Sequence, residues 1–267
     1  PISEEELQRQ QELLLEYVRQ AVTLENVNRF AGQVLNHRET GSALELASTQ
    51  SQEFIKIMKQ YFTKQENNKS LILFFTGWGM DQNTLSINKK DFDTCICFDY
   101  TDIDFEKSHY KNYQAIDVYG WSMGVWAASY TLQNCNLPIR KSVAINGTIF
   151  PIEKERGIDP IIFQKTIDLL NEQSLLKFNK RMCGSKENFQ FFIKHSSLRS
   201  IESLKQELIS IQSMVKKDMT STFQWDKAII GTRDFIFPTK NQLKAWGKIK
   251  YEIIDEAHFL DFNKYVD

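Results

Sequence analysis

Short apolar runs that alternate with helical patterns limit the folds open to this chain more than any other feature. The first run, SLILFF at 70–75, is apolar without interruption, as expected of a strand buried on both faces of a sheet. Later runs with strand character lie at 94–100, 115–120, 141–146, 227–231 and 250–255. Helical patterns separate several of them, notably 123–134 and 239–247. This alternation predicts an α/β fold with a mainly parallel sheet and helices on both faces.

Residues 151–222 interrupt the alternation. This stretch shows helical patterns and no convincing strand. An inserted helical cap over the sheet explains the interruption. We therefore expect one α/β domain over 58–267, with the cap at about 151–222.

The first 57 residues differ in composition from the rest. Residues 1–55 contain no lysine, whereas lysine dominates the basic residues from Lys56 onward. Ser3 and Glu6 form a capping-box pattern, and apolar residues recur at helical spacing. One hypothesis is an appended helical segment, either a natural fusion or an engineered addition, with Met58 as the original start. The alternative, an ordinary helical extension packed on the main domain, stays equally open.

Bulk composition excludes several function classes. The 267 residues are 42% hydrophobic and carry a formal net charge of −1, so charge favours neither nucleic acid nor an anionic membrane as partner. The sequence shows no membrane-spanning run and no signal-peptide pattern. None of the four cysteines has zinc-site spacing, which favours reduced core thiols and a cytoplasmic location. Nothing in the sequence indicates the oligomeric state.

The stretch VYGWSMGVWAASY at 118–130 carries the clearest chemical signal. GWSMG fits the G-x-S-x-G pattern, in which a serine stands on a tight turn between a strand and a helix. A side chain at Gly120 or Gly124 would collide with a neighbouring strand or helix in such a turn. The turn holds the Ser122 hydroxyl above the sheet edge, next to the N-terminus of the new helix. Ser122 is therefore the candidate nucleophile.

A serine hydroxyl needs a base, and the base needs an acid to orient it. In this arrangement the partners follow the serine in the order acid, then histidine. His258 follows the last predicted strand, and Asp234 lies in a loop after the strand at 227–231. Order and position therefore predict His258 as base and Asp234 as acid. Asp255 and Asp226 are competitors for the acid.

The developing oxyanion of such a reaction needs hydrogen-bond donors in place. The backbone N–H of Met123, directly after the nucleophile, is one candidate. The second is the backbone N–H of Trp78 in FFTGWGMD, the glycine-flanked loop after the first predicted strand. Together these groups predict ester cleavage through an acyl-enzyme, without a metal or other cofactor.

Several of these motifs resemble those of a known family. LILFFTGWGMD, CICFDYTD, YGWSMGVWAA, AINGT, KRMCG, IIGTRDFIFP and AHF resemble the BioG-type pimeloyl-[acyl-carrier protein] methyl ester esterases of biotin synthesis. The resemblance covers roughly 58–267 and implies an α/β-hydrolase fold with Ser122, Asp234 and His258 as catalytic triad. It also implies Trp78 as the tryptophan of the oxyanion loop. The implied substrate is a methyl pimeloyl group carried by acyl carrier protein.

The cap shows a weak independent signal for an acidic partner. Residues 151–224 hold twelve Lys or Arg and nine Asp or Glu, a net charge of +3. KFNKRMCGSK concentrates four of these basic residues: Lys177, Lys180, Arg181 and Lys186. They are candidates for docking the carrier protein, and a solvated helix face explains them equally well. The apolar cap residues Phe163, Leu170, Phe178, Phe189 and Phe192 either line an acyl channel or form core.

Two other functions remain open from the sequence. The same triad serves general carboxylesterases, acyltransferases and acyl thioesterases, which differ in the acyl pocket. A protein of this fold that has lost catalysis would instead act as a partner-binding module.

Overall fold

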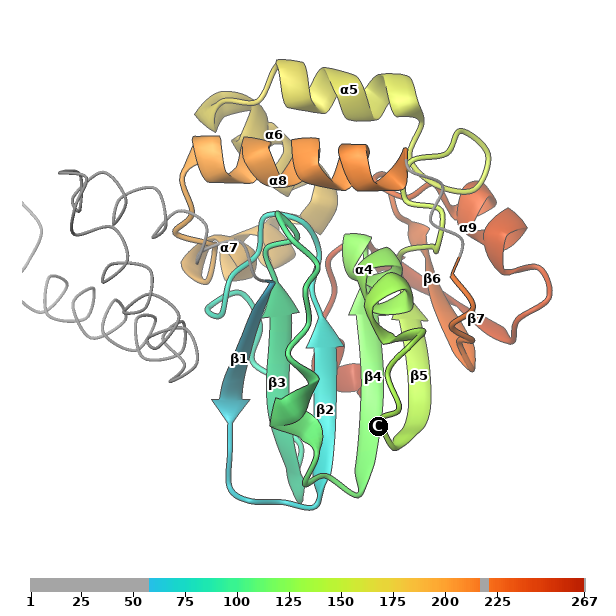
Figure 1. The fold of residues 1–267 in the computed structure, drawn as a ribbon. Coiled ribbons are helices and arrows are strands. Elements are labelled where there is room, and N and C mark those ends of the chain that lie inside the picture. Colours follow the sequence, from blue (N-terminus) through green and yellow to red (C-terminus); the bar gives the residue numbers. More distant parts are fainter. Residues whose placement is uncertain (1–57, 217–220, 267) are drawn as a thin grey trace, which may run out of the picture. The chain divides into compact units, whose positions relative to one another are not determined.

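The structure is a computed structural model that describes residues 58–216 and 221–266 (Figure 1). The expectation of a helical segment at 1–57 lies outside the described residues. A seven-stranded sheet in the order β1-β3-β2-β4-β5-β6-β7 forms the centre. Every neighbouring pair is parallel except β1 with β3. The predicted fold class, a mainly parallel sheet with helices and an inserted helical cap, is confirmed.

The observed strands agree with the apolar runs to within a few residues. Their bounds are β1 Lys59–Lys64, β2 Ser70–Phe75, β3 Phe92–Phe98, β4 Ala115–Trp121, β5 Ile139–Ile145, β6 Lys227–Arg233 and β7 Tyr251–Ala257. The sequence analysis missed β1, which pairs antiparallel with β3. This strand, KQYFTK, is partly exposed along its whole length and therefore lacks the apolar run of a central strand.

Four helices between β5 and β6 form the cap. They are α5 Pro160–Asp168, α6 Glu172–Cys183, α7 Lys186–Lys194 and α8 Ile201–Val215. Each helix begins at an N-cap residue whose side chain accepts from a backbone N–H group in the first turn. These residues are Asp159, Asn171, Ser185 and Ser200. Figure 1 shows α5, α6 and α8 above the carboxyl ends of β2 to β5. The cap therefore covers the sheet edge at which catalytic loops of such folds lie.

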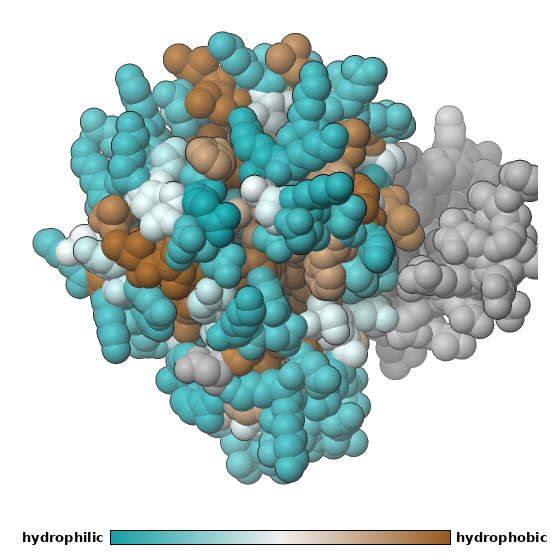
Figure 2. Space-filling model, turned by 180° about the vertical axis from the view of Figure 1, so that it is seen from behind, coloured by the Kyte–Doolittle hydropathy of each residue, from teal (hydrophilic) through white to brown (hydrophobic). Residues whose placement is uncertain are grey.

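The remaining helices pack on the sheet. They are η1 Lys107–Tyr110, α4 Met123–Leu132, α9 Thr239–Trp246 and η2 Phe262–Lys264. α4 packs against β4 and β2, and α9 packs against β6. Within the ranges that the structure describes, no helix combines the length and apolar character that a membrane crossing requires. Figure 2 shows a mainly hydrophilic face whose hydrophobic side chains lie in separate clusters.

Candidate active site

Ser122 lies between the end of β4 and the start of α4, as the sequence predicts. Its backbone has φ 58° and ψ −126°, a conformation that is strained for a residue with a side chain. Ser122 N–H donates to the Ile145 carbonyl on β5 at 3.0 Å, which holds the turn to the sheet. Strain that the surrounding structure maintains is typical of a serine held ready for reaction.

The two flanking glycines are required by close backbone approaches. A Cβ at Gly124 would lie 2.2 Å from the Phe75 carbonyl oxygen at the end of β2. A Cβ at Gly120 would lie 2.9 Å from Val125 Cα on α4. The collisions with strand and helix that the sequence analysis expects are therefore present at both positions.

The three predicted triad residues meet in the folded chain although they are far apart in sequence. His258 Nε2 lies 2.9 Å from Ser122 Oγ, and His258 Nδ1 lies 2.8 Å from Asp234 Oδ2. All three residues are buried. The chain of contacts has the hydrogen-bond lengths and the order that nucleophile activation requires.

Asp234 is held by donors on both carboxylate oxygens. The backbone N–H groups of Ile236 and Phe237 donate to Oδ1 at 2.8 and 2.9 Å. Gln242 on α9 donates to Oδ2 at 3.0 Å, beside the contact to His258. These bonds fix the carboxylate in an orientation that faces the imidazole.

The competing carboxylates have other partners. Asp255 is mostly exposed and forms a 2.9 Å ion pair with Arg233 Nε. Asp226 accepts from the backbone N–H and the hydroxyl of Ser142 at 2.8 and 2.9 Å. Arg233 thus pairs with Asp255, whereas Asp234 faces His258.

Two residues that the sequence analysis missed hold the backbone of His258. The Trp121 indole N–H donates to the His258 carbonyl at 2.9 Å. Asn146 Nδ2 donates to the same carbonyl at 3.0 Å and to the Ala257 carbonyl at 2.8 Å. Asn146 follows β5 at the same sheet edge and has φ 45°. A polar residue before glycine at a strand end, AING, is the signal that could have identified it.

The predicted oxyanion loop passes directly beside the nucleophile. A Cβ added to Gly77 would lie 3.2 Å from Ser122 Cβ, so a side chain here would force its neighbours to shift by a few tenths of an ångström. The next residue, Trp78, lines the cavity at Ser122. Its indole N–H donates to the Leu204 carbonyl on α8 at 2.9 Å. Met123 is the first residue of α4 and also lines the cavity. The assignment of their amides as oxyanion donors stays a prediction.

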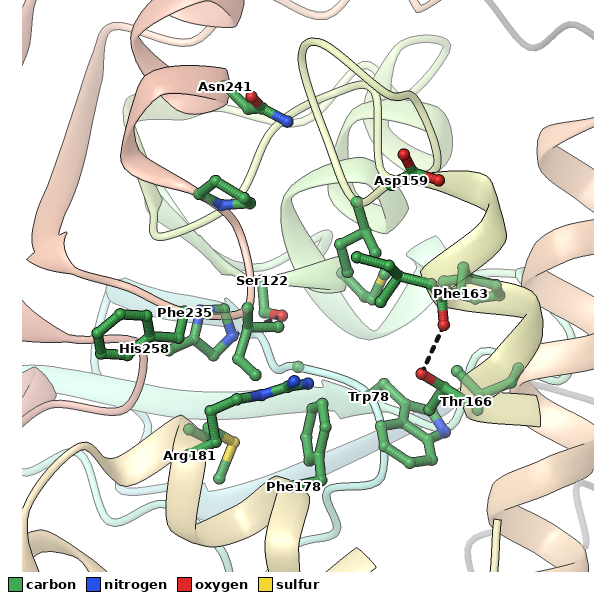
Figure 3. A pocket seen from close by; sticks show the side chains of 18 of the residues that line it. Trp78, Ser122, Asp159, Phe163, Thr166, Phe178, Arg181, Phe235, Asn241 and His258 are labelled. Atoms are coloured by element: carbon green, nitrogen blue, oxygen red, sulfur yellow. Dashed lines mark hydrogen bonds between the residues drawn. The ribbon is translucent and has the colours of Figure 1, made fainter. Parts of the chain in front are cut away.

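A cavity of about 300 Å³ opens over Ser122 between the cap and the sheet edge. Figure 3 shows Ser122 and His258 facing this space, with Phe163 and Thr166 reaching it from the cap. Its other apolar lining residues include Ile158, Ile162, Phe178, Met182, Leu208, Phe235 and Ile236. Such a lining suits an aliphatic acyl chain.

Of the five apolar cap residues predicted for a channel or a core, Phe163 and Phe178 line this cavity. Phe192 lines a neighbouring cavity of about 180 Å³, which shares Trp78 and Phe178 with the first. Leu170 is buried, and Phe189 packs against the apolar core.

The four predicted docking residues differ in their surroundings. Lys177, Lys180 and Lys186 are exposed on α6 and α7. Arg181 is exposed too, but it also lines the cavity, with its guanidinium 5.7 Å from the centre of the Phe178 ring. Figure 3 shows the Arg181 side chain extending toward the space in front of Ser122.

The four cysteines are free thiols. Burial raises the pKa of the Cys183 thiol to about 12 and also raises the pKa of Cys135. Thiols with such pKa values are protonated at neutral pH and are poor nucleophiles. In the described ranges, no group of three or more His, Cys, Asp or Glu side chains is arranged to hold a metal ion.

Comparisons with known proteins agree with the fold and show the family. The family described as "Pimeloyl-ACP methyl esterase BioG" matches residues 57–267. The chain is 44% identical over 226 residues to a protein of Bacteroides fragilis (strain 638R) named malonyl-[acyl-carrier protein] O-methyltransferase. That match covers 84% of this chain but 43% of the relative, so the chain spans less than half of that protein's length.

Solved structures give the same result. The crystal structure of BioG from Haemophilus influenzae has 33% identity and a TM-score of 0.68, and the match covers 76% of this chain and 94% of that one. An esterase from Exiguobacterium antarcticum has a TM-score of 0.63 over 78% of this chain and 92% of its own, and its 16% identity shows the fold alone. This chain has the α/β-hydrolase fold and belongs to the BioG family of pimeloyl-ACP methyl esterases.

Proposed function

We propose that this chain hydrolyses the methyl ester of a pimeloyl group carried by acyl carrier protein, a step of biotin synthesis. The observation that carries the proposal is the contact chain from Ser122 through His258 to Asp234, at the floor of a largely apolar cavity. An aliphatic ester with a distant polar attachment fits such a cavity, because its chain contacts apolar side chains while its attachment points to solvent.

The proposed reaction proceeds through an acyl-enzyme. Ser122 Oγ attacks the ester carbonyl carbon while His258 Nε2 takes the hydroxyl proton. Asp234 accepts from Nδ1–H, which keeps the reactive tautomer and stabilises the imidazolium. The amides of Trp78 and Met123 donate to the oxyanion. Methanol leaves with the proton from His258, and a water activated by His258 then releases the carboxylic acid and free serine.

Family membership supports the methyl ester as the bond that is cleaved. The printed name of the Bacteroides fragilis relative describes an O-methyltransferase acting on malonyl-carrier protein. Methylation of a carboxyl oxygen would produce the type of ester that our proposed reaction removes. We therefore assign the esterase chemistry to this chain and the methyl transfer to that longer protein alone.

We further propose that exposed cap residues attract the carrier protein. Lys177, Lys180 and Lys186 lie on α6 and α7, and Arg181 from the same cap lines the cavity. A cationic surface at this place increases the rate of encounter with an acidic carrier.

Mass spectrometry of methyl pimeloyl-carrier protein tests the proposed substrate. The expected product keeps the acyl group on the carrier and loses the mass of one CH₂. Release of free carrier with an intact methyl ester would instead identify a thioesterase. Hydrolysis of small chromogenic esters without turnover of the carrier substrate would identify a general carboxylesterase.

The Ser122→Ala variant tests the nucleophile with both substrates. It should keep the fold and lose turnover as well as labelling by a fluorophosphonate probe. Wild-type protein that folds yet shows no labelling at Ser122 would favour the partner-binding function. Normal turnover by the alanine variant would show that another group is the nucleophile.

Charge reversal tests the docking surface. Lys177→Glu combined with Lys186→Glu should lower kcat/KM for the carrier substrate and leave small-ester hydrolysis unchanged. The matched control is Lys194→Glu at the end of α7, another exposed lysine of the cap. Equal effects of the test and control variants on the carrier substrate would contradict a local docking role.

A further inference from the structure

A buried carboxylate outside the contact chain of Ser122, His258 and Asp234 holds the loop that approaches the nucleophile. Glu207 on α8 is 0% exposed. Its Oε2 accepts from the backbone N–H of Gly79 at 3.2 Å, and its Oε1 accepts from the backbone N–H of Tyr100 at 2.9 Å. One side chain of the cap therefore binds the loop after β2 and the loop after β3.

Arg199 neutralises this carboxylate. Its Nη1 donates to Glu207 Oε2 at 2.7 Å, and its Nη2 donates to Asp99 Oδ1 at 2.9 Å. Burial raises the pKa of Glu207, and the Arg199 charge opposes that rise. Burial alone would lower the pKa of Arg199, but the charges of Glu207 and Asp99 outweigh it and raise that pKa. The ion pair keeps a buried negative charge from standing alone near the site.

Other contacts join the same loop to the same part of the cap. The Trp78 indole N–H donates to the Leu204 carbonyl, less than one turn before Glu207 on α8. Arg199 Nη1 also contacts the Met80 carbonyl at 3.4 Å, and Leu198 N–H donates to Asp81 Oδ2 at 2.9 Å. Residues 78–81 are thus attached to the cap at every position.

The attachment at Gly79 controls the orientation of the preceding peptide. Gly79 has φ +78°, a left-handed backbone conformation that favours glycine, and its N–H donates to Glu207 Oε2. Its N–H belongs to the peptide that joins Trp78 to Gly79, so the bond to Glu207 fixes the peptide that follows the Trp78 α-carbon. The Trp78 N–H belongs to the peptide that precedes the same α-carbon. An oxyanion donor must hold its position within about half an ångström, so such anchoring has a direct effect on catalysis.

A purely stabilising role explains the ion pair poorly. Buried ion pairs contribute little net stability, because the cost of removing two charges from water offsets their attraction. A carboxylate with two acceptor oxygens is, however, one of the few side chains that can bind two loop amides and a guanidinium at once. The chemistry of Glu207 fits the need to fix the direction of particular N–H groups.

We propose that Glu207, with Arg199 as counter-ion, is a positioning residue that aligns the Trp78 amide for the oxyanion. The proposal rests on the assignment of Trp78 as an oxyanion donor in the proposed function. Glu207 acts only through the loop and does not touch the substrate.

The test compares Glu207→Gln with wild type on a short chromogenic ester. Glutamine keeps the shape but replaces one acceptor oxygen by an NH₂ donor, so it cannot bind both loop amides. We expect kcat to fall roughly 10- to 100-fold, somewhat less than the loss of a complete oxyanion donor, with KM within about threefold. Affinity for a trifluoromethyl ketone, whose serine adduct carries an oxyanion, should fall by a similar factor. Glu202→Gln, an exposed carboxylate on the same helix, is the matched control and should change neither value.

The outcomes separate positioning from folding. A folded Glu207→Gln variant with unchanged kcat, or with normal affinity for the ketone, overturns the proposal. If that variant does not fold, Glu207→Gln with Arg199→Gln removes both charges of the buried ion pair, and Asp99 keeps its hydrogen bonds from Thr101. The same kinetic loss in the folded double variant supports the proposal, and wild-type kinetics overturns it. Wild type and Ser122→Ala are measured in parallel. An active wild type with an inactive Ser122→Ala supports the nucleophile assignment, and an active Ser122→Ala shows that this assignment itself has failed.

Discussion

Replacing Asp234 with asparagine is the most direct test of the catalytic geometry. In the structure, Oδ1 of Asp234 accepts from the amides of Ile236 and Phe237, and Oδ2 faces His258 Nδ1 and the Gln242 amide. An asparagine whose oxygen keeps the two backbone amides must turn its NH₂ group toward His258. That NH₂ group then donates to Nδ1.

The change therefore reverses the tautomer of His258. If Nδ1 accepts, the ring proton moves to Nε2, which faces Ser122 Oγ and can no longer take its proton. In triads of this kind the substitution lowers kcat about 10⁴-fold. At about 1.4 kcal/mol for each factor of ten, that corresponds to roughly 5 kcal/mol of transition-state stabilisation. The NH₂ groups of the new asparagine and of Gln242 also oppose each other, which destabilises the loop by about 1–3 kcal/mol.

The assay is hydrolysis of a short chromogenic ester, with kcat and KM measured separately and folding followed by Tm. Asp255→Asn is the matched control, because Asp255 was the nearest competitor in sequence and is exposed beside Arg233. The control should keep kcat within about twofold of wild type. If Asp234→Asn retains a tenth or more of wild-type kcat in folded protein, the assignment of the acid is wrong.

Three further predictions follow from buried groups. Gly124→Ala should lower the free energy of unfolding by about 1–3 kcal/mol and also lower kcat, because its Cβ would meet the Phe75 carbonyl; an unchanged Tm would contradict the close packing of this turn. Burial raises the pKa of Asp93, but hydrogen bonds, including one from the Tyr113 hydroxyl, outweigh it and hold the pKa below its ordinary value. Ionised Asp93 therefore stabilises the fold at pH values above the pKa that it has in the unfolded chain, and this stabilisation is lost as pH falls through its pKa in the folded protein. Acid should accordingly lower the free energy of unfolding in urea less for Asp93→Asn than for wild type. Cys183, a buried thiol with a pKa of about 12, should react with iodoacetamide only after unfolding, and rapid labelling of native protein would show that its site opens.

Sequence patterns were sufficient to predict the position of a strand or residue where that position follows from local geometry. SLILFF predicted β2 without error, because a strand buried on both faces must be apolar along its whole length. The position of Ser122 at the strand-to-helix turn followed from the glycines that such a turn requires at two fixed positions. Chain order then selected Asp234 and His258, and the structure brings His258 into contact with both Ser122 and Asp234, while their catalytic roles stay predictions.

Gln242 and Glu207, which the sequence analysis also missed, have roles that depend on tertiary contacts rather than on local geometry. Gln242 lies inside a short helix, and nothing near it in sequence shows that its amide faces Asp234. Glu207 lies on a cap helix whose pattern resembles an ordinary amphipathic helix, although its carboxylate binds loops that are 107 and 128 residues away in sequence. Partners at such separations are determined by tertiary packing, which periodicity does not encode.

The cap also contacts the chain beside His258, the predicted base, and this leads to a last prediction. Gly184 ends α6 with φ +66°, and an added Cβ would lie 2.6 Å from Ala257 Cβ, directly before His258. Gly184→Ala should therefore shift the His258 loop and lower kcat on a short ester while KM changes little. Gly247→Ala is the matched control, because its Cβ would meet ordinary contacts of 3.6 Å or more at a right-handed helix end. If Gly184→Ala lowers Tm but leaves kcat of the folded protein unchanged, the cap covers the site without holding the base in place.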